Sequence, residues 1–248
     1  MDILNNGIEA PAQVSLGKTI LKEMRPHYRL HASPDTLKGW RVIFMEKNRE
    51  NYPKSVPLIE QGEYVNCLYY IVSGLVECTH IDEDGIETLL EVQGPGIIMG
   101  LQPFFQKAPS MATFSALTDV VAATLSEDEV YAHIGRDNSL ATELTIELCN
   151  IVDGLVRRIF SNTEHAHDRI IEFLCELCEI DVSEKMDNGH FYIGLTQSEF
   201  ARVARTTRVT AAKVFGELKK MDYLDTVYSG IIVKDYHSLK RIATEKEA

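Results

Sequence analysis

The chain has 248 residues, enough for one large or two modest domains with their own cores, and an ordinary globular composition. Its formal net charge is −12, which argues against indiscriminate binding to nucleic acid. No apolar run reaches the roughly twenty residues of a membrane span, and residues 1–12 lack the pattern of a signal peptide. We therefore expect a cytoplasmic protein that does not contact a membrane.

The sequence pattern of the N-terminal half changes from helical to β-rich at Tyr52. Before it, we expect a loose arm with a short helix at 16–24 and a further helix that starts at Ser33-Pro34-Asp35. After it, short β-rich runs alternate with glycine turns, which predicts strands at 56–59, 67–72, 75–81, 87–92, 111–117 and 120–125. Many short strands indicate a sandwich or barrel, and a helical pattern resumes at 126–134.

A long helix is predicted from Asp137 to Thr163. Apolar residues recur on one side at three- and four-residue steps, at Leu140, Leu144, Leu148, Ile151, Leu155 and Ile159. A second stripe consists of Ile146, Val152, Val156 and Phe160. Two apolar faces favour a helix that packs on its own chain and on a second copy, with contacts at Leu144, Leu148, Ile151 and Leu155. The alternative is a long core helix of one globular domain.

The last third of the chain has the pattern of a helix-turn-helix. A helix at 169–180, a polar loop at 181–189 and a strand at 190–195 come first. Thr196 and Glu199 then form a capping box for a helix at 197–204, and Thr207 caps a second helix at 208–221. A hairpin at 223–233 follows as a wing. Residues 195–220 carry a local charge of +4 in an acidic chain, which favours binding at one place.

The second of these helices has a buried and an outward face. Ala211, Val214, Phe215 and Leu218 share the face expected to be buried, which directs Arg208, Val209, Ala212 and Lys213 toward a major groove. We expect Arg208 and Lys213 to contact bases or phosphates of double-stranded DNA. Phosphate-positioning roles are predicted for Thr196, Ser198 and Thr210. A generic helical hairpin is the alternative.

These segments resemble the CRP/FNR family of transcription regulators. The run LTQSEFARVARTTRVTAAKVFGELKKMDYL is similar to their winged helix-turn-helix, and YPKSVPLIEQGEYVNCLYYIVSGLVE with DEDGIETLLEVQGPGIIMG is similar to their β-roll. The resemblance implies an α+β chain with a cyclic-nucleotide-binding-type β-roll in a sensing domain at 1–136, a dimerisation helix at 137–165 and a winged helix-turn-helix at 166–248. It also implies a homodimer on a near-palindromic operator, with RNA polymerase as a partner.

The sequence departs from the family pattern at two positions of the predicted helix-turn-helix. Arg205 stands in the turn where glycine is usual, so we expect the turn to be strained or shifted. Val209 stands where many members have glutamate, which accepts a hydrogen bond from cytosine N4. Because valine offers only apolar contact, this chain is expected to read an A·T pair there.

The sensing half also departs from the cyclic-nucleotide binders of the family, which present Gly-Glu and Arg-Ser to the ligand. The matching positions here are Gly100-Leu101-Gln102 and Ser110-Met111, so no cation is left for a buried phosphate. We expect no tight response to cyclic AMP. The predicted pocket between the β-roll and the long helix is mostly apolar and comprises Leu90, Met99, Gln102, Phe104, Phe105, Met111, Thr113, Leu148 and Cys149.

Such a lining suits a small hydrophobic or aromatic effector, and Lys107 is a candidate partner if the effector is a phenolate or carboxylate. The pocket and Val209 are similar to the CprK-like branch, which controls organohalide respiration and responds to halogenated aromatics. The alternative is a filled core without a ligand.

A redox- or haem-based sensor of the same fold is the second hypothesis. Cys78 and His80 share a strand face, and Cys175 and Cys178 share a helix face, but two ligands do not complete a zinc site. An iron–sulfur site is disfavoured because no cysteine precedes Cys67. We predict no cofactor and no metal. Enzyme motifs such as a nucleophile elbow or a phosphate loop are absent, so we do not expect an enzyme.

Overall fold

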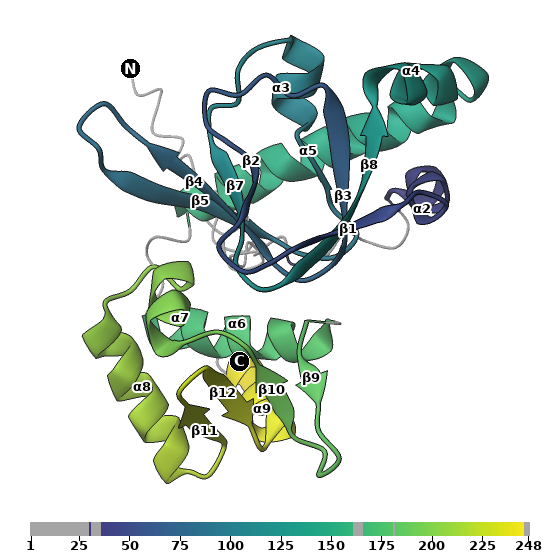
Figure 1. Ribbon diagram of the computed structural model, residues 1–248. Coiled ribbons are helices and arrows are strands. Elements are labelled where there is room, and N and C mark those ends of the chain that lie inside the picture. The colour runs from purple at the N-terminus through teal and green to yellow at the C-terminus, as the bar shows by residue number, and fades with distance from the viewer. Residues whose placement is uncertain (1–29, 31–35, 161–165, 181, 246–248) are drawn as a thin grey trace, which may run out of the picture.

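A computed structural model describes residue 30 and residues 36–160, 166–180 and 182–245. The helix expected at 16–24, the helix start at Ser33 and the last residues of the long helix lie outside this range. The described residues form two bodies, an upper one that ends in a long helix and a lower one with the C-terminus (Figure 1). These two bodies correspond to the sensing and DNA-reading halves expected from the sequence.

The upper body is a roll of two four-stranded antiparallel sheets, ordered β1-β8-β3-β6 and β2-β7-β4-β5. The strands span Arg49–Tyr52 (β1), Pro57–Ile59 (β2), Cys67–Ser73 (β3), Val76–Ile81 (β4), Glu87–Gln93 (β5), Ile98–Met99 (β6), Thr113–Ala116 (β7) and Val120–Ser126 (β8). The six predicted strands are confirmed. β1 and β6 were not predicted, because β1 is almost entirely exposed and β6 has only two residues.

The space between the sheets is filled by apolar side chains. They include Leu58, Ile71, Val76, Met99 and Ala122, all buried in one cluster. Their alternation with outward residues follows the two-residue period of a strand, which is why the sequence pattern located the strands well.

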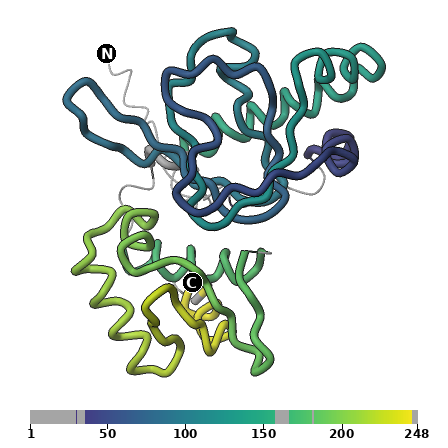
Figure 2. The backbone as a smooth tube through the Cα atoms, viewed as in Figure 1, coloured from purple at the N-terminus to yellow at the C-terminus, as the bar shows by residue number. Residues whose placement is uncertain are grey.

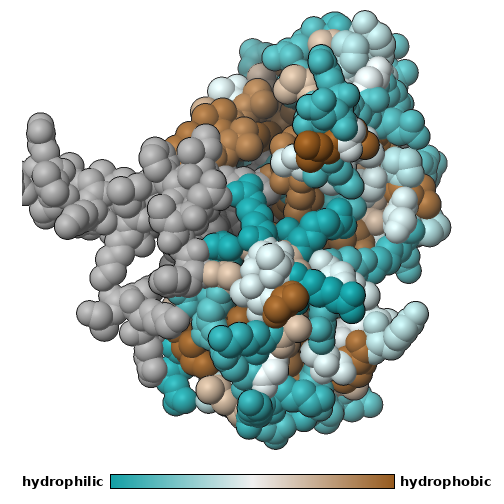
Figure 3. Space-filling view, turned by 90° about the vertical axis from the view of Figure 1, so that its left-hand side faces the viewer, coloured by the Kyte–Doolittle hydropathy of each residue, from teal (hydrophilic) through white to brown (hydrophobic). Residues whose placement is uncertain are grey.

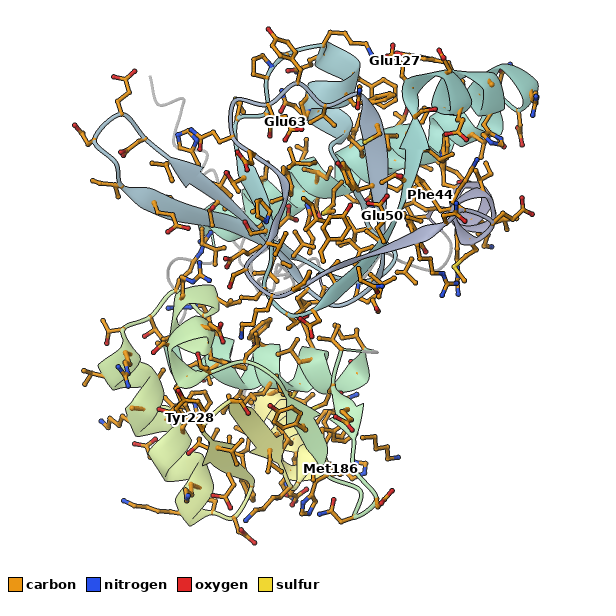
Figure 4. The ribbon with its side chains drawn as sticks, in the orientation of Figure 1. Phe44, Glu50, Glu63, Glu127, Met186 and Tyr228 are labelled. Atoms are coloured by element: carbon orange, nitrogen blue, oxygen red, sulfur yellow. The ribbon has the colours of Figure 1, made fainter. Side chains whose placement is uncertain are left out.

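Four helices complete the upper body: α2 (Lys38–Met45), α3 (Leu101–Gln106), α4 (Glu127–Arg136) and α5 (Ser139–Phe160). α2 is tied to the start of α5. The Glu143 carboxylate accepts hydrogen bonds from the backbone of Gly39 at 3.0 Å and Trp40 at 3.3 Å, and Trp40 Nε1 donates to the Leu140 carbonyl at 2.9 Å. Phe44 points from α2 to the roll and stacks on Tyr70 with ring centroids 5.2 Å apart (Figure 4).

The lower body consists of α6 (Ala166–Glu179), α7 (Gln197–Val203), α8 (Arg208–Lys220) and α9 (Tyr236–Glu245) around a small sheet. That sheet has the order β11-β12-β10-β9, with strands at Glu184–Lys185 (β9), Phe191–Ile193 (β10), Leu224–Val227 (β11) and Gly230–Val233 (β12). Phe173, Phe200 and Phe215 join α6, α7 and α8 in its core, with centroid separations of 4.8 and 5.4 Å. The predicted α+β class with a winged helix-turn-helix is confirmed.

The two bodies meet where α6 and α7 face the roll (Figure 2). Leu75, Val92 and Leu117 of the roll belong to the same buried cluster as the lower-body core. Ion pairs cross the junction: Lys54 Nζ lies 2.7 Å from Glu199 Oε1, and Arg202 pairs with Glu77 and, at 3.9 Å, with Glu87. We call the Arg202–Glu77 pair the interdomain pair.

Candidate nucleic-acid interface

The two helices of the helix-turn-helix, α7 and α8, begin at the residues predicted to cap them. Thr196 Oγ1 accepts from the Glu199 backbone at 3.3 Å, and Glu199 accepts in return from the Thr196 backbone at 2.7 Å, which is a capping box. Thr207 Oγ1 accepts from the Thr210 backbone at 3.1 Å. These caps satisfy N–H groups at the helix starts and fix where α7 and α8 begin.

The α8 helix buries one face and exposes the other, as predicted. Ala211, Val214, Phe215 and Leu218 are at most 4% exposed, whereas the Val209 side chain is 80% exposed. Arg208, Ala212 and Lys213 are exposed beside Val209. A helix held by four buried residues presents the opposite face as a rigid surface, and this surface carries two cations and two apolar side chains.

The basic side chains of α8 differ in whether they already form an ion pair within the chain. Among the described residues, Arg208 and Lys213 form no ion pair, while Lys219 pairs with Asp225 at 2.6 Å. Ser198 is exposed at the start of α7, whereas the Thr196 hydroxyl already donates to Glu199 Oε2 at 2.9 Å. The Thr210 hydroxyl lies 2.9 Å from that of Thr207. Arg208 and Lys213 are therefore the cations best placed to meet a phosphate or a base.

The turn between α7 and α8 contains a contact that the sequence did not predict. Arg205 has φ 49°, the left-handed conformation that glycine usually supplies, which agrees with the expectation of strain. Arg169 of α6 donates from Nε to the Ala204 carbonyl at 2.9 Å and from Nη2 to the Arg205 carbonyl at 3.0 Å. Because 35 residues separate Arg169 from Ala204, no local sequence signal points to this contact.

The predicted wing is confirmed as the hairpin of β11 and β12. Tyr228 at its tip is fully exposed (Figure 4). Tyr192 OH lies 3.0 Å from Ser229 Oγ, and a Cβ added to Gly230 would lie 2.3 Å from the Ile193 carbonyl, so this close approach needs glycine. At the base of the wing, hydrogen bonds from Lys219 and Lys234 lower the pKa of Asp225 to about 2. Tyr228 is a second exposed group beside α8 that the sequence analysis did not select.

The predicted effector-pocket residues do not converge on one enclosed cavity within the described part of the chain. Met99 and Phe104 are buried in two different clusters, and Phe105, Met111, Leu148, Leu90 and Cys149 are exposed. Thr113 lines an open groove of about 460 Å³ with Pro57, Glu60, Gln61, Ile81 and Ser115. Gln102 donates to Gln106 at 2.5 Å.

The roll also differs from a phosphate-binding site in its charges. Residues 49–137 contain only four Lys or Arg residues, at 49, 54, 107 and 136, and all four are exposed. Lys107 Nζ pairs with Glu127 at 2.6 Å and lies 4.7 Å from the centre of the Phe104 ring. Ser110 is buried, and its hydroxyl donates to the Ala112 carbonyl at 2.6 Å.

The structure divides the first apolar stripe predicted for the long helix α5, because Leu148 and Leu155 of that stripe are exposed. Leu140 and Leu144 are buried in the core of the upper body, and Ile151 packs against the same core. Five further apolar side chains of the helix are each 37–59% exposed, and we call them together the α5 stripe: Ile146, Leu148, Val152, Leu155 and Val156. Hydrophobic side chains gather on the upper body in Figure 3, while the lower body is largely hydrophilic on that face. Leu144 is therefore unavailable to a second copy, and Leu148 and Leu155 are available.

Comparison with known proteins agrees with this architecture. Residues 49–137 match the family description of a cyclic nucleotide-binding domain, and residues 168–242 match that of a Crp-like helix-turn-helix domain. The chain belongs to the CRP/FNR family of transcription regulators. It is 22% identical to the CRP-like cAMP-activated global transcriptional regulator of Mycobacterium tuberculosis, over 78% of this chain and 87% of that protein.

Solved structures of the family share the fold. A CRP/FNR-family transcriptional regulator from Thermus thermophilus has a TM-score of 0.64 and 25% identity, and the match covers 79% of this chain and 98% of that one. CprK complexed with OCPA has a TM-score of 0.54 and 22% identity, with 82% and 92% covered. The likeness to CprK is one of fold, and it does not place this chain in the CprK branch of the family.

The cysteines and histidines singled out in the sequence are in packed or hydrogen-bonded positions. Burial raises the pKa of the Cys175 thiol to about 12, and burial raises that of Cys178 equally. Cys78 is buried, and His80 Nδ1 lies 2.7 Å from the Met111 carbonyl. Within the described residues, no three His, Cys, Asp or Glu side chains are grouped as metal ligands, and no helix could span a membrane.

Proposed function

We propose that this regulator binds a specific DNA operator as a homodimer and responds to a small effector. Its parts are a sensing domain at 1–136, a dimerisation helix at 137–165 and a reader at 166–248. The observation that carries the proposal is the outward face of α8, on which Arg208, Val209 and Lys213 are exposed while the opposite face is buried. It acts in the cytoplasm with RNA polymerase as its partner.

DNA binding is tested by fluorescence anisotropy with a family-type palindromic duplex. A base contact contributes about 1–3 kcal/mol, so Arg208→Ala should weaken operator binding by about ten- to a hundredfold. A phosphate contact adds roughly one unit to the slope of log affinity against log salt, so Lys213→Ala should reduce that slope by about one. Lys185→Ala removes an exposed cation on the distant β9 strand and serves as the control. Equal effects of all three changes would contradict the proposed interface.

Val209 sets the proposed sequence preference. Its side chain, 80% exposed on the outward face, offers methyl groups and no hydrogen-bond acceptor. We expect it to face a thymine methyl, so that selection of bound sequences returns A·T at that position. Val209→Glu supplies an acceptor and should shift the preference to G·C. A wild-type selection that returned G·C would contradict this assignment.

The proposed effector is a small apolar or aromatic molecule, including halogenated aromatics, and not cyclic AMP. Supporting this, all four Lys and Arg residues between 49 and 137 are exposed, and Lys107 is paired with Glu127. A cyclic phosphate inside the roll would be buried without a cationic partner, at a large cost in desolvation. Leu148 and Cys149 lie on the exposed side of α5, so a second copy would complete the proposed site.

Calorimetry and operator binding distinguish these effectors. A halogenated phenol or arylacetate should raise operator affinity, because a ligand shifts a conformational equilibrium only by its difference in affinity for the two states. Millimolar cyclic AMP should leave operator affinity within twofold. A many-fold rise with cyclic AMP would refute the proposal, and Leu148→Asn should weaken the response to the aromatic ligand.

A further inference from the structure

The turn between α7 and α8 adopts a conformation that its own residues do not favour. Arg205 has φ 49°, and an L-residue with a Cβ is disfavoured there. Two backbone hydrogen bonds close the turn, from Arg205 to Arg202 at 3.1 Å and from Thr206 to Ala201 at 2.9 Å. α8 begins at Arg208, three residues beyond Arg205, so a change of backbone angle at Arg205 would rotate the whole of α8.

The side chain of Arg169 binds this turn from outside. Nε donates to the Ala204 carbonyl at 2.9 Å and Nη2 to the Arg205 carbonyl at 3.0 Å, so one planar guanidinium holds two successive carbonyls. Ala204 is fully buried, and it ends α7, where a cation also interacts favourably with the helix dipole. Removing Arg169 would take this half-buried donor away from the Ala204 carbonyl.

The helix that carries Arg169 is itself held in place by core packing. Arg169 lies in the first turns of α6, and four residues later Phe173 of the same helix contacts Phe200 of α7, with ring centroids 4.8 Å apart. Both aromatic rings are fully buried. α6 is thus fixed on α7 by core packing, and the guanidinium projects from this fixed base onto the turn.

We propose that Arg169 is a positioning residue for DNA recognition. It holds the left-handed turn at Arg205 and thereby sets the angle at which α8 presents Arg208 and Val209. Arg169 takes over the role that a glycine at position 205 would fill, because it stabilises from outside what glycine would adopt freely. The proposal rests on the proposed DNA-binding function, and it adds to it a residue that does not itself touch DNA.

Four variants test the proposal: Arg169→Ala, Arg169→Lys, Arg205→Gly and the double variant Arg169→Ala/Arg205→Gly. We expect Arg169→Ala to weaken operator binding about tenfold and to reduce the ratio of operator to random-duplex affinity. Arg169→Lys should restore only part of the loss, because an ammonium lacks the planar fork. In the double variant, glycine adopts the turn unaided, so operator affinity should return to within threefold of Arg205→Gly.

Two outcomes would overturn the inference. One is an Arg169→Ala protein that melts at a lower temperature but keeps the affinity and specificity of the wild type at 10 °C. The other is an equal loss from Arg169→Ala in the arginine and glycine backgrounds. Lys185→Ala controls for loss of one positive charge from the same domain.

Amide hydrogen exchange separates this inference from the proposed function. The Thr206 amide should exchange at least fivefold faster in Arg169→Ala than in the wild type, in the absence of DNA. If the wild type binds no duplex but this increase occurs, the proposed function fails and the role of Arg169 in the turn stands. If the wild type binds its operator and the Thr206 amide is unchanged, the inference fails alone.

Discussion

The interdomain pair gives a sharp prediction because its two charges differ in burial. The Glu77 side chain is 14% exposed and that of Arg202 is 38% exposed. Breaking a buried pair costs about 3–5 kcal/mol, and exposed pairs contribute about 0.2–1 kcal/mol. We expect Arg202→Ala to lower the free energy of unfolding by about 2 kcal/mol, since Glu77 is left shielded. Glu77→Gln should cost about 1 kcal/mol, because Arg202 still reaches water and Glu87.

The loss in Arg202→Ala should also depend on pH. Burial raises the pKa of Glu77 above its ordinary value, and the Arg202 guanidinium opposes that rise. Without Arg202 the pKa rises further, so the folded state binds a proton that the unfolded state releases, and stability falls as pH rises through the raised pKa. The destabilisation should therefore be smaller at pH 5 than at pH 8.

Urea denaturation followed by circular dichroism at both pH values measures this effect. Glu77→Gln/Arg202→Ala should lose the pH-dependent part, because no carboxylate remains at position 77. Arg49→Ala removes an exposed guanidinium that lies 3.9 Å from the Met45 sulfur, and it should change the free energy of unfolding by less than about 0.5 kcal/mol. An Arg202→Ala loss of the same size at pH 5 and pH 8 would refute the reasoning.

Three further predictions follow from single contacts. Glu143→Gln should destabilise the upper body by about 1 kcal/mol and loosen the environment of Trp40, because the amide replaces the carboxylate that caps α2; an unchanged melting temperature would count against it. At pH 8, a thiol reagent should modify Cys175 and Cys178 only after unfolding, since burial raises their pKa to about 12; rapid labelling of either buried thiol would contradict their placement. Phe200→Ala should cost about 3–5 kcal/mol in the lower body and abolish operator binding, and a change below about 1 kcal/mol would show that its aromatic core is misassigned.

Local patterns were sufficient for most of the architecture. The caps at Thr196 and Thr207, the buried face of α8 and the alternating strands of the roll all depend on residues close together in sequence. The helices α3 (Leu101–Gln106) and α9 (Tyr236–Glu245) and the short strands β1, β6 and β9 were not predicted. The short strands carry little periodicity, so their conformation depends on the neighbours they pair with.

Contacts between distant residues could not be predicted in this way. The hydrogen bonds of Arg169 span 35 and 36 residues, and the interdomain pair joins α7 to β4. The sequence pattern placed Leu144, Leu148 and Leu155 in one stripe of α5, whereas the structure buries Leu144 against its own chain and exposes Leu148 and Leu155. The proposed effector pocket depends on how separate segments of the roll and α5 are arranged. The sequence indicates that these residues are mostly apolar, but it does not indicate which of them lie close together.

We propose that two copies of this chain pair along the α5 stripe and carry two α8 helices to one operator. Light scattering of the protein–duplex complex after size-exclusion chromatography tests it most directly. We predict a mass of two 28.0 kDa chains for each duplex, and a shift to one chain with weakened binding for Leu155→Glu. Val42→Glu, at an exposed apolar position on α2, is the control and should remain dimeric. A wild-type complex with a single chain that still binds the operator tightly would contradict the account.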